Sequence, residues 1–254
     1  MAELKREPAP AAELPSAKPD SLRKILRKLV PIFLLKERSI IAHLGPGAGW
    51  TYASLCLQDA IGMRAANQRL IPRSSRSLLF VCYGNIMRSP MAEALMLRAL
   101  EETPCSEKIE VASAGLHATA GREVHPWALE VAAAMGISLA DHRAKPLSKE
   151  MVEHADCVFA MDFQNKAELL TLYPEAASKI YLMSAYAAGR QRYREIADPF
   201  LGDLEATKSC YRELQICVRN LITSTFSPRE KLAEGAAVPD NNPSQASRKQ
   251  LGTR

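Results

Sequence analysis

The sequence predicts an α/β fold, in which a four-stranded parallel sheet has helices on both faces. The first observation is that four short apolar runs of strand length follow residue 76, at 77–82, 109–114, 156–161 and 179–183. The second is that stretches of helical pattern separate these runs and follow the last of them. This alternation is typical of parallel strands joined by right-handed crossovers.

Each element has a local signal. The run 77–82 is apolar almost throughout, as expected of a strand buried on both faces. Ser89 and Pro90 predict an N-cap and first residue for a helix over 90–102. Further helices are expected at 126–135, shortly after Ser148, at 164–172 and at 203–222.

The chain divides into four parts by composition. Residues 1–20 hold five Ala and four Pro and few large apolar side chains, so we expect them to be disordered. Residues 21–75 are predicted to form a helical extension. It contains a basic amphipathic stretch after Ser21 and a second helix at 53–66, after a cluster of glycines. Residues 76–227 form the predicted α/β domain, and residues 228–254 a disordered tail.

Composition and charge exclude several classes of protein. The net charge is +5, but residues 1–75 carry 12 Lys and Arg against 6 Asp and Glu, so the basic character lies outside the predicted domain. This distribution argues against a nucleic-acid enzyme. The uncharged stretch 39–57 contains three glycines and a proline, which argues against a membrane span. Six cysteines without a CxxC pair, and no signal-peptide pattern, predict a cytoplasmic protein with free thiols and no structural zinc.

The most informative segment is the loop after the first strand, which runs from Cys82 to Arg88 in a Cys-x5-Arg pattern. The cysteine closes a buried strand, the loop contains a glycine and an asparagine that tolerate unusual backbone angles, and a helix follows at once. Backbone N–H groups that converge above a helix N-terminus bind an anion of phosphate size and favour the thiolate form of cysteine. Arg88 supplies a planar fork for two phosphoryl oxygens, and Ser89 a hydroxyl for the sulfur. The predicted phosphate-binding loop comprises Tyr83, Gly84, Asn85, Ile86, Met87 and Ser89 beside Cys82 and Arg88.

This segment resembles the phosphate-binding loop of the low-molecular-weight protein tyrosine phosphatases. The likeness continues through Ser113-Ala114-Gly115, Asp141-His142-Arg143, Met161-Asp162 and Asp198-Pro199, and it covers roughly residues 77 to 226. The resemblance implies the family's four-stranded parallel sheet and the hydrolysis of phosphotyrosine without a metal or other cofactor.

The resemblance also implies a role for each matching residue. Cys82 is the expected nucleophile that forms a cysteinyl phosphate, Arg88 the phosphate clamp, and Asp198 the general acid and then base. Asn85, Ser113 and His142 match positions of a polar network that braces the loop. Thr119 stands where many relatives place an aromatic wall, and Phe200-Leu201 replaces an aromatic pair beside the acid, so the binding slot is expected to be weaker than theirs.

Other interpretations stay open. Ile86 favours phosphotyrosine, because phosphoarginine phosphatases usually have threonine there, yet a phosphoarginine phosphatase is an alternative. A thiol-coupled arsenate reductase needs two further relay cysteines. A phosphotyrosine-binding pseudophosphatase is the non-enzyme alternative. The expected partner is a phosphotyrosine protein, with a bacterial tyrosine kinase as one candidate. Residues 21–45 are expected to pack on the domain, with peripheral membrane contact as the alternative.

Overall fold

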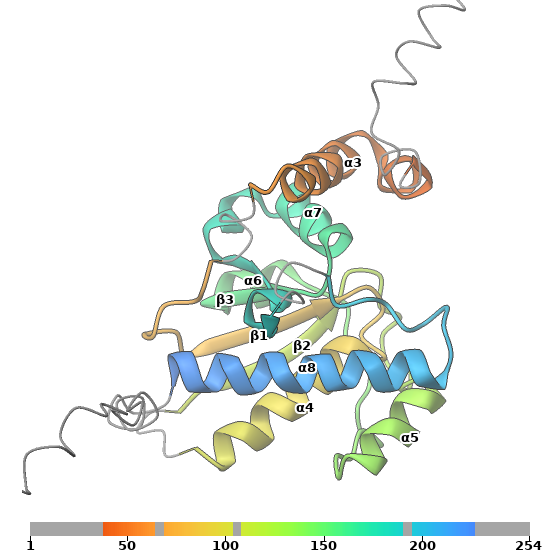
Figure 1. Cartoon of the computed structure of the whole chain (residues 1–254), viewed down its shortest axis with the longest axis vertical. Coiled ribbons are helices and arrows are strands. Elements are labelled where there is room, and N and C mark those ends of the chain that lie inside the picture. The colour runs from red at the N-terminus through yellow and green to blue at the C-terminus, as the bar shows by residue number, and fades with distance from the viewer. Residues whose placement is uncertain (1–37, 64–68, 104–107, 190–194, 227–254) are drawn as a thin grey trace, which may run out of the picture.

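Four parallel strands form the centre of the molecule, in the order β2-β1-β3-β4 (Figure 1). They are β1 (Ser77–Cys82), β2 (Glu110–Gly115), β3 (Cys157–Ala160) and β4 (Ile180–Leu182). The structure is a computed structural model that describes residues 38–63, 69–103, 108–189 and 195–226. The predicted fold class is confirmed, and β3 and β4 are shorter than their apolar runs. The predicted disordered ends, 1–20 and 228–254, and the basic stretch after Ser21 lie outside the described residues.

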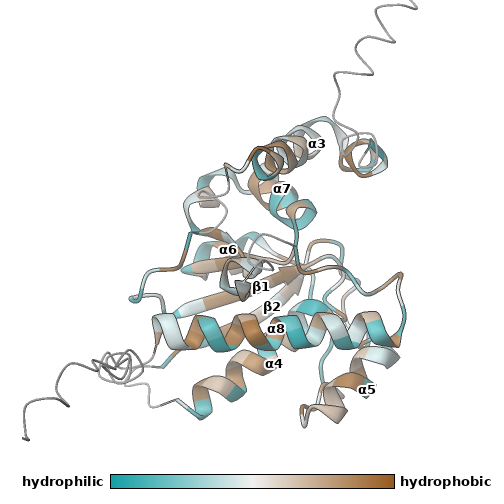
Figure 2. Ribbon diagram, viewed as in Figure 1, coloured by the Kyte–Doolittle hydropathy of each residue, from teal (hydrophilic) through white to brown (hydrophobic). Residues whose placement is uncertain are grey.

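The central strand β1 separates two hydrophobic cores. Leu78 and Phe80 belong to one core, and Leu79 and Val81 to the other, because successive side chains of a strand point to opposite faces. Figure 2 shows apolar colour on β1, between the two layers of helices. Its last residue, Cys82, pairs in register with Gly115 of β2. The sheet therefore carries Cys82 at its carboxyl edge, where parallel α/β folds form their binding sites.

Helices cover both faces of the sheet. One face is covered by α4 (Arg88–Glu101), α5 (Pro126–Ala134) and α8 (Leu204–Thr225), and the other by α6 (Lys149–His154) and α7 (Phe163–Leu172) (Figure 1). Two 3-10 helices, η2 (Pro174–Lys179) and η3 (Met183–Tyr186), flank β4. The short helix expected after Ser148 is α6, and Ser148 is its N-cap. Asp203 caps α8 by accepting a hydrogen bond of 2.8 Å from Ala206 N.

The start of α4 differs from the prediction. The helix begins at Arg88, and Met87 occupies the cap position without a side-chain bond to the helix. Ser89 is inside the first turn and is not the N-cap, because its hydroxyl points to Cys82, 3.0 Å from Sγ. The side chain of Ser89 therefore contacts the cysteine of the loop and does not cap the helix.

The described part of the extension is the helix α3 (Arg38–Ala60), which lies against α7 (Figure 1). The prediction that a helix starts only after the glycine cluster is wrong, since the chain kinks at Gly45 (φ 72°) and is helical on both sides of it. Gly47 faces Thr171 of α7 closely, and Tyr52 and Leu55 are buried in the core on that side. None of the helices within the described residues is long and apolar enough to cross a membrane.

Candidate active site

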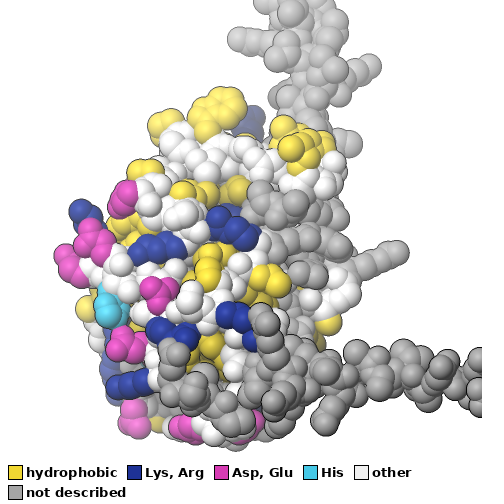
Figure 3. Space-filling view, turned by 90° about the vertical axis from the view of Figure 1, so that its left-hand side faces the viewer, with side chains coloured by type: hydrophobic (Ala, Val, Ile, Leu, Met, Phe, Trp, Pro, Cys, Tyr) yellow, Lys and Arg dark blue, Asp and Glu magenta, His cyan; other side chains and the backbone are white. Residues whose placement is uncertain are grey.

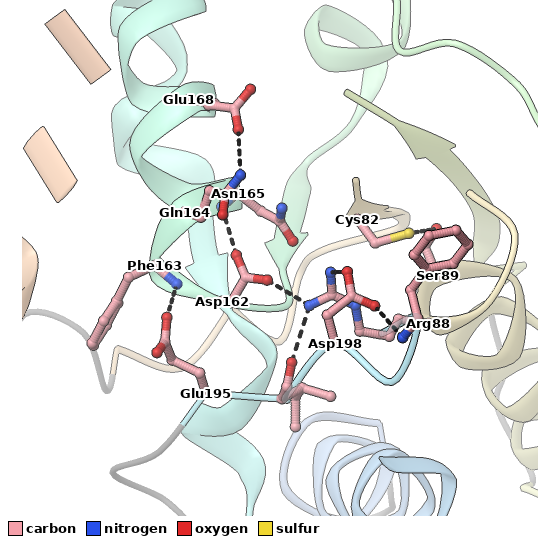
Figure 4. Close-up of polar contacts among 12 residues, drawn as sticks. Cys82, Arg88, Ser89, Asp162, Phe163, Gln164, Asn165, Glu168, Glu195 and Asp198 are labelled. Carbon is pink, nitrogen blue, oxygen red and sulfur yellow. Dashed lines mark hydrogen bonds and ion pairs between the residues drawn. The ribbon is translucent and has the colours of Figure 1, made fainter. Parts of the chain in front are cut away.

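The thiol of Cys82 lies among hydrogen-bond donors at the floor of the loop. Its side chain is almost fully buried, and Asn85 N donates to Sγ at 3.2 Å. The Ser89 hydroxyl lies 3.0 Å from Sγ (Figure 4). Donors that converge on a sulfur stabilise its negative charge. The position therefore suits a thiolate nucleophile.

Asn85 holds the loop in place through a network of hydrogen bonds. Among the described residues it is the one non-glycine residue with positive φ (52°), and it is fully buried. Its amide nitrogen donates to Ser89 Oγ and to Ser113 Oγ, each at 2.9 Å. Its amide oxygen accepts from Lys145 N at 2.8 Å and lies 3.2 Å from His142 Nε2. Because Lys145 N–H requires an oxygen at that place, the orientation of the amide is fixed.

These bonds set the direction of the serine hydroxyls. The amide nitrogen of Asn85 can only donate, so Ser89 and Ser113 both accept from it. Ser113 then donates its own proton to Glu93 Oε2 at 2.5 Å. Ser89 keeps its own proton, which it can donate to Cys82 Sγ or to the carbonyl of Ala114 at 3.2 Å. A thiolate at Cys82 can only accept, so Ser89 is then the hydroxyl donor to the sulfur.

His142 closes the network on its outer side. Its Nε2 faces two acceptors of Asn85, the backbone oxygen at 3.1 Å and Oδ1, so Nε2 carries the proton. Burial lowers the pKa of His142 and favours the neutral ring. A depressed pKa contributes stability that is present above the unfolded value of about 6.5 and is lost as the pH falls.

Arg88 is buried and joined to two carboxylates. Its Nη1 lies 2.5 Å from Asp162 Oδ2 and donates to the carbonyl of Ile196 at 3.1 Å, while Nη2 lies 2.6 Å from Asp198 Oδ2 (Figure 4). Burial alone would lower the pKa of Arg88, but the charges of Asp162 and Asp198 outweigh it and raise the pKa. The guanidinium is held in place as a permanent cation.

The two carboxylates differ in their surroundings. Asp162 is the N-cap of α7, where Oδ1 accepts from Asn165 N at 2.6 Å. Asp198 stands on the loop before α8, with a half-exposed side chain whose Oδ1 accepts from Phe200 N at 3.1 Å. Asp162 is thus placed to orient Arg88, and Asp198 is accessible for proton transfer.

Cys82, Arg88 and Asp198 line one cavity of about 170 Å³. The rings of Tyr83 and His117 stack in its wall with centroids 4.4 Å apart, and Phe200 contributes a further ring that meets His125 edge-on at 5.8 Å. Aromatic side chains therefore form part of the cavity wall. The cavity is lined by Cys82, Tyr83, Gly84, Ile86, Met87, Arg88, His117, Arg122, Asp198 and Phe200.

The comparison with known families is decisive at this point. A model of the low molecular weight phosphotyrosine protein phosphatases matches residues 77–234, which is more than half of the 254 residues. The chain belongs to this family. The predicted family and the predicted class of enzyme, a protein phosphatase, are confirmed.

Individual relatives of this phosphatase carry two kinds of name. The probable low molecular weight protein-tyrosine-phosphatase EpsP of Ralstonia nicotianae is 34% identical over 140 residues, which are 55% of this chain and 89% of that protein. A protein-arginine-phosphatase of Bacillus subtilis is 33% identical over 144 residues, 57% and 93% of the two chains. The crystal structure of the tyrosine phosphatase amsI of Erwinia amylovora superposes with a TM-score of 0.54 at 30% identity, covering 62% of this chain and 99% of that one.

The structure of the phosphatase brings the predicted site residues together. Cys82, Arg88 and Asp198 line one cavity, and Ser113 and His142 meet at Asn85. Sequence reasoning missed two residues that line the cavity, His117 and Arg122. His117 Nε2 lies 2.5 Å from the largely buried carboxylate of Glu168, which is 51 residues away on α7. No local sequence pattern around His117 predicts an ion-pair partner so far away in the chain.

The network around Asn85 yields a first prediction. We expect Asn85→Ala to lower the free energy of unfolding by about 2–4 kcal/mol, because buried partners lose their bonds and alanine is strained at positive φ. Turnover of an aryl phosphate is expected to fall about 100-fold, since the loop loses its brace. Urea unfolding and steady-state kinetics measure the two effects.

Asn220→Ala is the matched control. Asn220 Nδ2 donates to the carbonyl of Tyr186 at 2.7 Å, away from the cavity, so this variant loses stability with unchanged turnover. An equal loss of turnover in both variants would contradict a specific role for Asn85.

Proposed function

We propose that this phosphatase hydrolyses phosphotyrosine in proteins through a cysteinyl-phosphate intermediate. The observation that carries the proposal is the placement of the Cys82 thiol, with donors at 3.0 and 3.2 Å, in a cavity that Arg88 and Asp198 also line. The aromatic slot formed by Tyr83, His117 and Phe200 supports a phenyl phosphate as the group that enters.

In the first step, the Cys82 thiolate attacks phosphorus as the bond from phosphorus to the phenolic oxygen breaks. Arg88 neutralises charge on the phosphoryl oxygens, which is the principal requirement of phosphoryl transfer. Protonated Asp198 gives its proton to the departing phenolate oxygen, because a phenolate is a poor leaving group near neutral pH.

In the second step, a water attacks the cysteinyl phosphate. Asp198, now a carboxylate, accepts the proton of the water as the new bond to oxygen forms. The bond between phosphorus and sulfur breaks, and the electron pair returns to Cys82 as a thiolate. The Ser89 hydroxyl, 3.0 Å from Sγ, stabilises that leaving thiolate.

The proposed preference for phosphotyrosine over phosphoarginine is argued from the side chain of Ile86. Its buried side chain lines the cavity with apolar surface, which suits a phenyl ring better than the charged guanidino group of phosphoarginine. Relatives are named both as tyrosine and as arginine phosphatases, so turnover of the two kinds of substrate must be compared directly.

Paired peptides of one sequence, with phosphotyrosine or phosphoarginine at the same position, test the preference. We expect kcat/KM to favour phosphotyrosine by about 100-fold, and Ile86→Thr to reduce that ratio by about tenfold. Faster release of phosphate from the phosphoarginine peptide would overturn the assignment. Tight binding of the phosphotyrosine peptide without release of phosphate would indicate a pseudophosphatase.

The arsenate reductase alternative is weakened by three of the four other described thiols. Cys157, Cys210 and Cys217 are buried, and burial raises the pKa of Cys157 to about 11, that of Cys210 to about 12, and also that of Cys217. Thiols of this kind are poor relay nucleophiles.

The partners we propose for this phosphatase are phosphoproteins that carry phosphotyrosine. An autophosphorylated bacterial tyrosine kinase is the first of them to test.

A further inference from the structure

The outer face of α3 carries large apolar side chains. Trp50, Leu57 and Ile61 follow one another at i, i+7 and i+11, so they share one stripe of the helix and its C-terminal end. Their exposed fractions are 78%, 43% and 60%, and Met63 just beyond is 63% exposed. Figure 3 shows hydrophobic side chains gathered at the end of the molecule where α3 lies.

This stripe is separate from the face by which α3 packs. Tyr52 and Leu55 point into the core beside α7 and are almost fully buried. The stripe is not needed to hold α3 on the domain, and α3 itself precedes residue 77, where the family match begins. Large apolar side chains exposed along one stripe of a helix make this stripe a candidate interaction surface.

The charge of the sequence before α3 indicates which kind of partner the stripe binds. Residues 1–75 carry 12 Lys and Arg against 6 Asp and Glu, and Arg23, Lys24, Arg27 and Lys28 lie within the 15 residues that precede α3 at Arg38. An anionic surface satisfies both the basic residues and the apolar stripe.

We propose that the α3 stripe of Trp50, Leu57 and Ile61 docks on an anionic lipid bilayer as a peripheral membrane contact. Tryptophan is the side chain most suited to the boundary between headgroups and acyl chains. The basic residues upstream attract the surface, and the stripe enters the boundary region. The phosphatase is thereby held beside phosphoproteins of the membrane.

Trp50 itself reports the contact. The chain has two tryptophans, so Trp127→Phe leaves Trp50 as the single fluorophore. Without vesicles, we expect iodide to quench Trp50 efficiently. Phosphatidylglycerol vesicles are expected to shift its emission to the blue and to protect it from iodide, while phosphatidylcholine vesicles have no effect. Protection from iodide before any lipid is added would mean that the chain's own residues cover the stripe, which overturns the proposal.

Co-sedimentation of the full chain with the same vesicles measures the affinity. We expect Trp50→Ser with Ile61→Ser to weaken binding by at least about tenfold, and salt to weaken binding of the parent chain. Leu97→Ser with Ile216→Ser is the control, because these side chains are 44% and 40% exposed on α4 and α8 and belong to no such stripe.

Three further results overturn the proposal. One is that the parent chain sediments with neither kind of vesicle. Another is that the Trp50 and Ile61 variant binds as tightly as the parent, which would assign binding to the basic residues alone. The third is that light scattering shows a dimer of the parent and a monomer of the variant, which would assign the stripe to a second copy of the chain.

Discussion

Cys82→Ser is expected to lower kcat on an aryl phosphate by at least about 10⁴-fold. A serine hydroxyl in the same place is a far weaker nucleophile than a thiolate, and no other described thiol lines the cavity. Arg88 and its two carboxylates are untouched by the change, so inorganic phosphate should still bind. Steady-state kinetics and calorimetric titration with phosphate measure the two properties.

Cys56→Ser is the control for this variant. Cys56 is half-buried on α3, outside the cavity, and its replacement should leave kcat within about twofold. Turnover by Cys82→Ser at the rate of the parent enzyme would remove Cys82 as the nucleophile. Loss of phosphate binding together with loss of stability would instead mean that the loop had collapsed.

Asp198→Asn is expected to lower kcat by about 10²–10⁴-fold on a phosphotyrosine peptide. The asparagine oxygen can still accept from Arg88 Nη2, so the geometry of the loop is retained while the transferable proton is lost. The loss should be smaller on p-nitrophenyl phosphate, because its leaving group needs less protonation. A series of aryl phosphates with leaving groups of different basicity measures this dependence.

Asp203→Asn is the control for Asp198→Asn, because it makes the same chemical change at a helix cap outside the cavity. Asp203 caps α8 five residues later in the chain, and asparagine is an equally good cap, so activity and stability should barely change. An Asp198→Asn enzyme that lost the same factor on every leaving group would contradict the assignment of Asp198 as the general acid.

The fold followed from the sequence because its signals are local. The run from Ser77 to Cys82 is apolar on both faces, and it became the central strand with side chains in both cores. The loop from Cys82 to Arg88 was predictable for the same reason, since strand end, tight loop and helix start adjoin one another. The unusual φ expected of Asn85 is observed.

The details that could not be predicted depend on contacts between distant segments. Ser89 resembled a helix cap, and only the position of the Cys82 sulfur shows why its hydroxyl turns inward. Gly47 and Gly49 resembled a break in the chain, but Gly47 lies where Thr171 of α7 approaches α3, and Gly49 where the carbonyl of Ile41 approaches from the other side of the kink. The pairing of His117 with Glu168 likewise requires that α7 be placed beside the loop.

The stacked pair of Tyr83 and His117 alters the expectation for the binding slot. Thr119 was expected to leave that wall without an aromatic group, but two rings 4.4 Å apart line the cavity instead. The slot is therefore built from residues at other positions of the chain, and the aromatic environment suited to phosphotyrosine is retained.

The covalent intermediate provides the most direct test of the mechanism. The enzyme is mixed with a radiolabelled phosphotyrosine peptide, quenched within one turnover and digested, and the labelled fragment is identified by mass spectrometry. We expect one phosphoryl group on the sulfur of Cys82, with more label in Asp198→Asn than in the parent if the second step is the more impaired. Full turnover with label on Ser89, or with no protein-bound label at any quench time, would contradict the cysteinyl-phosphate mechanism.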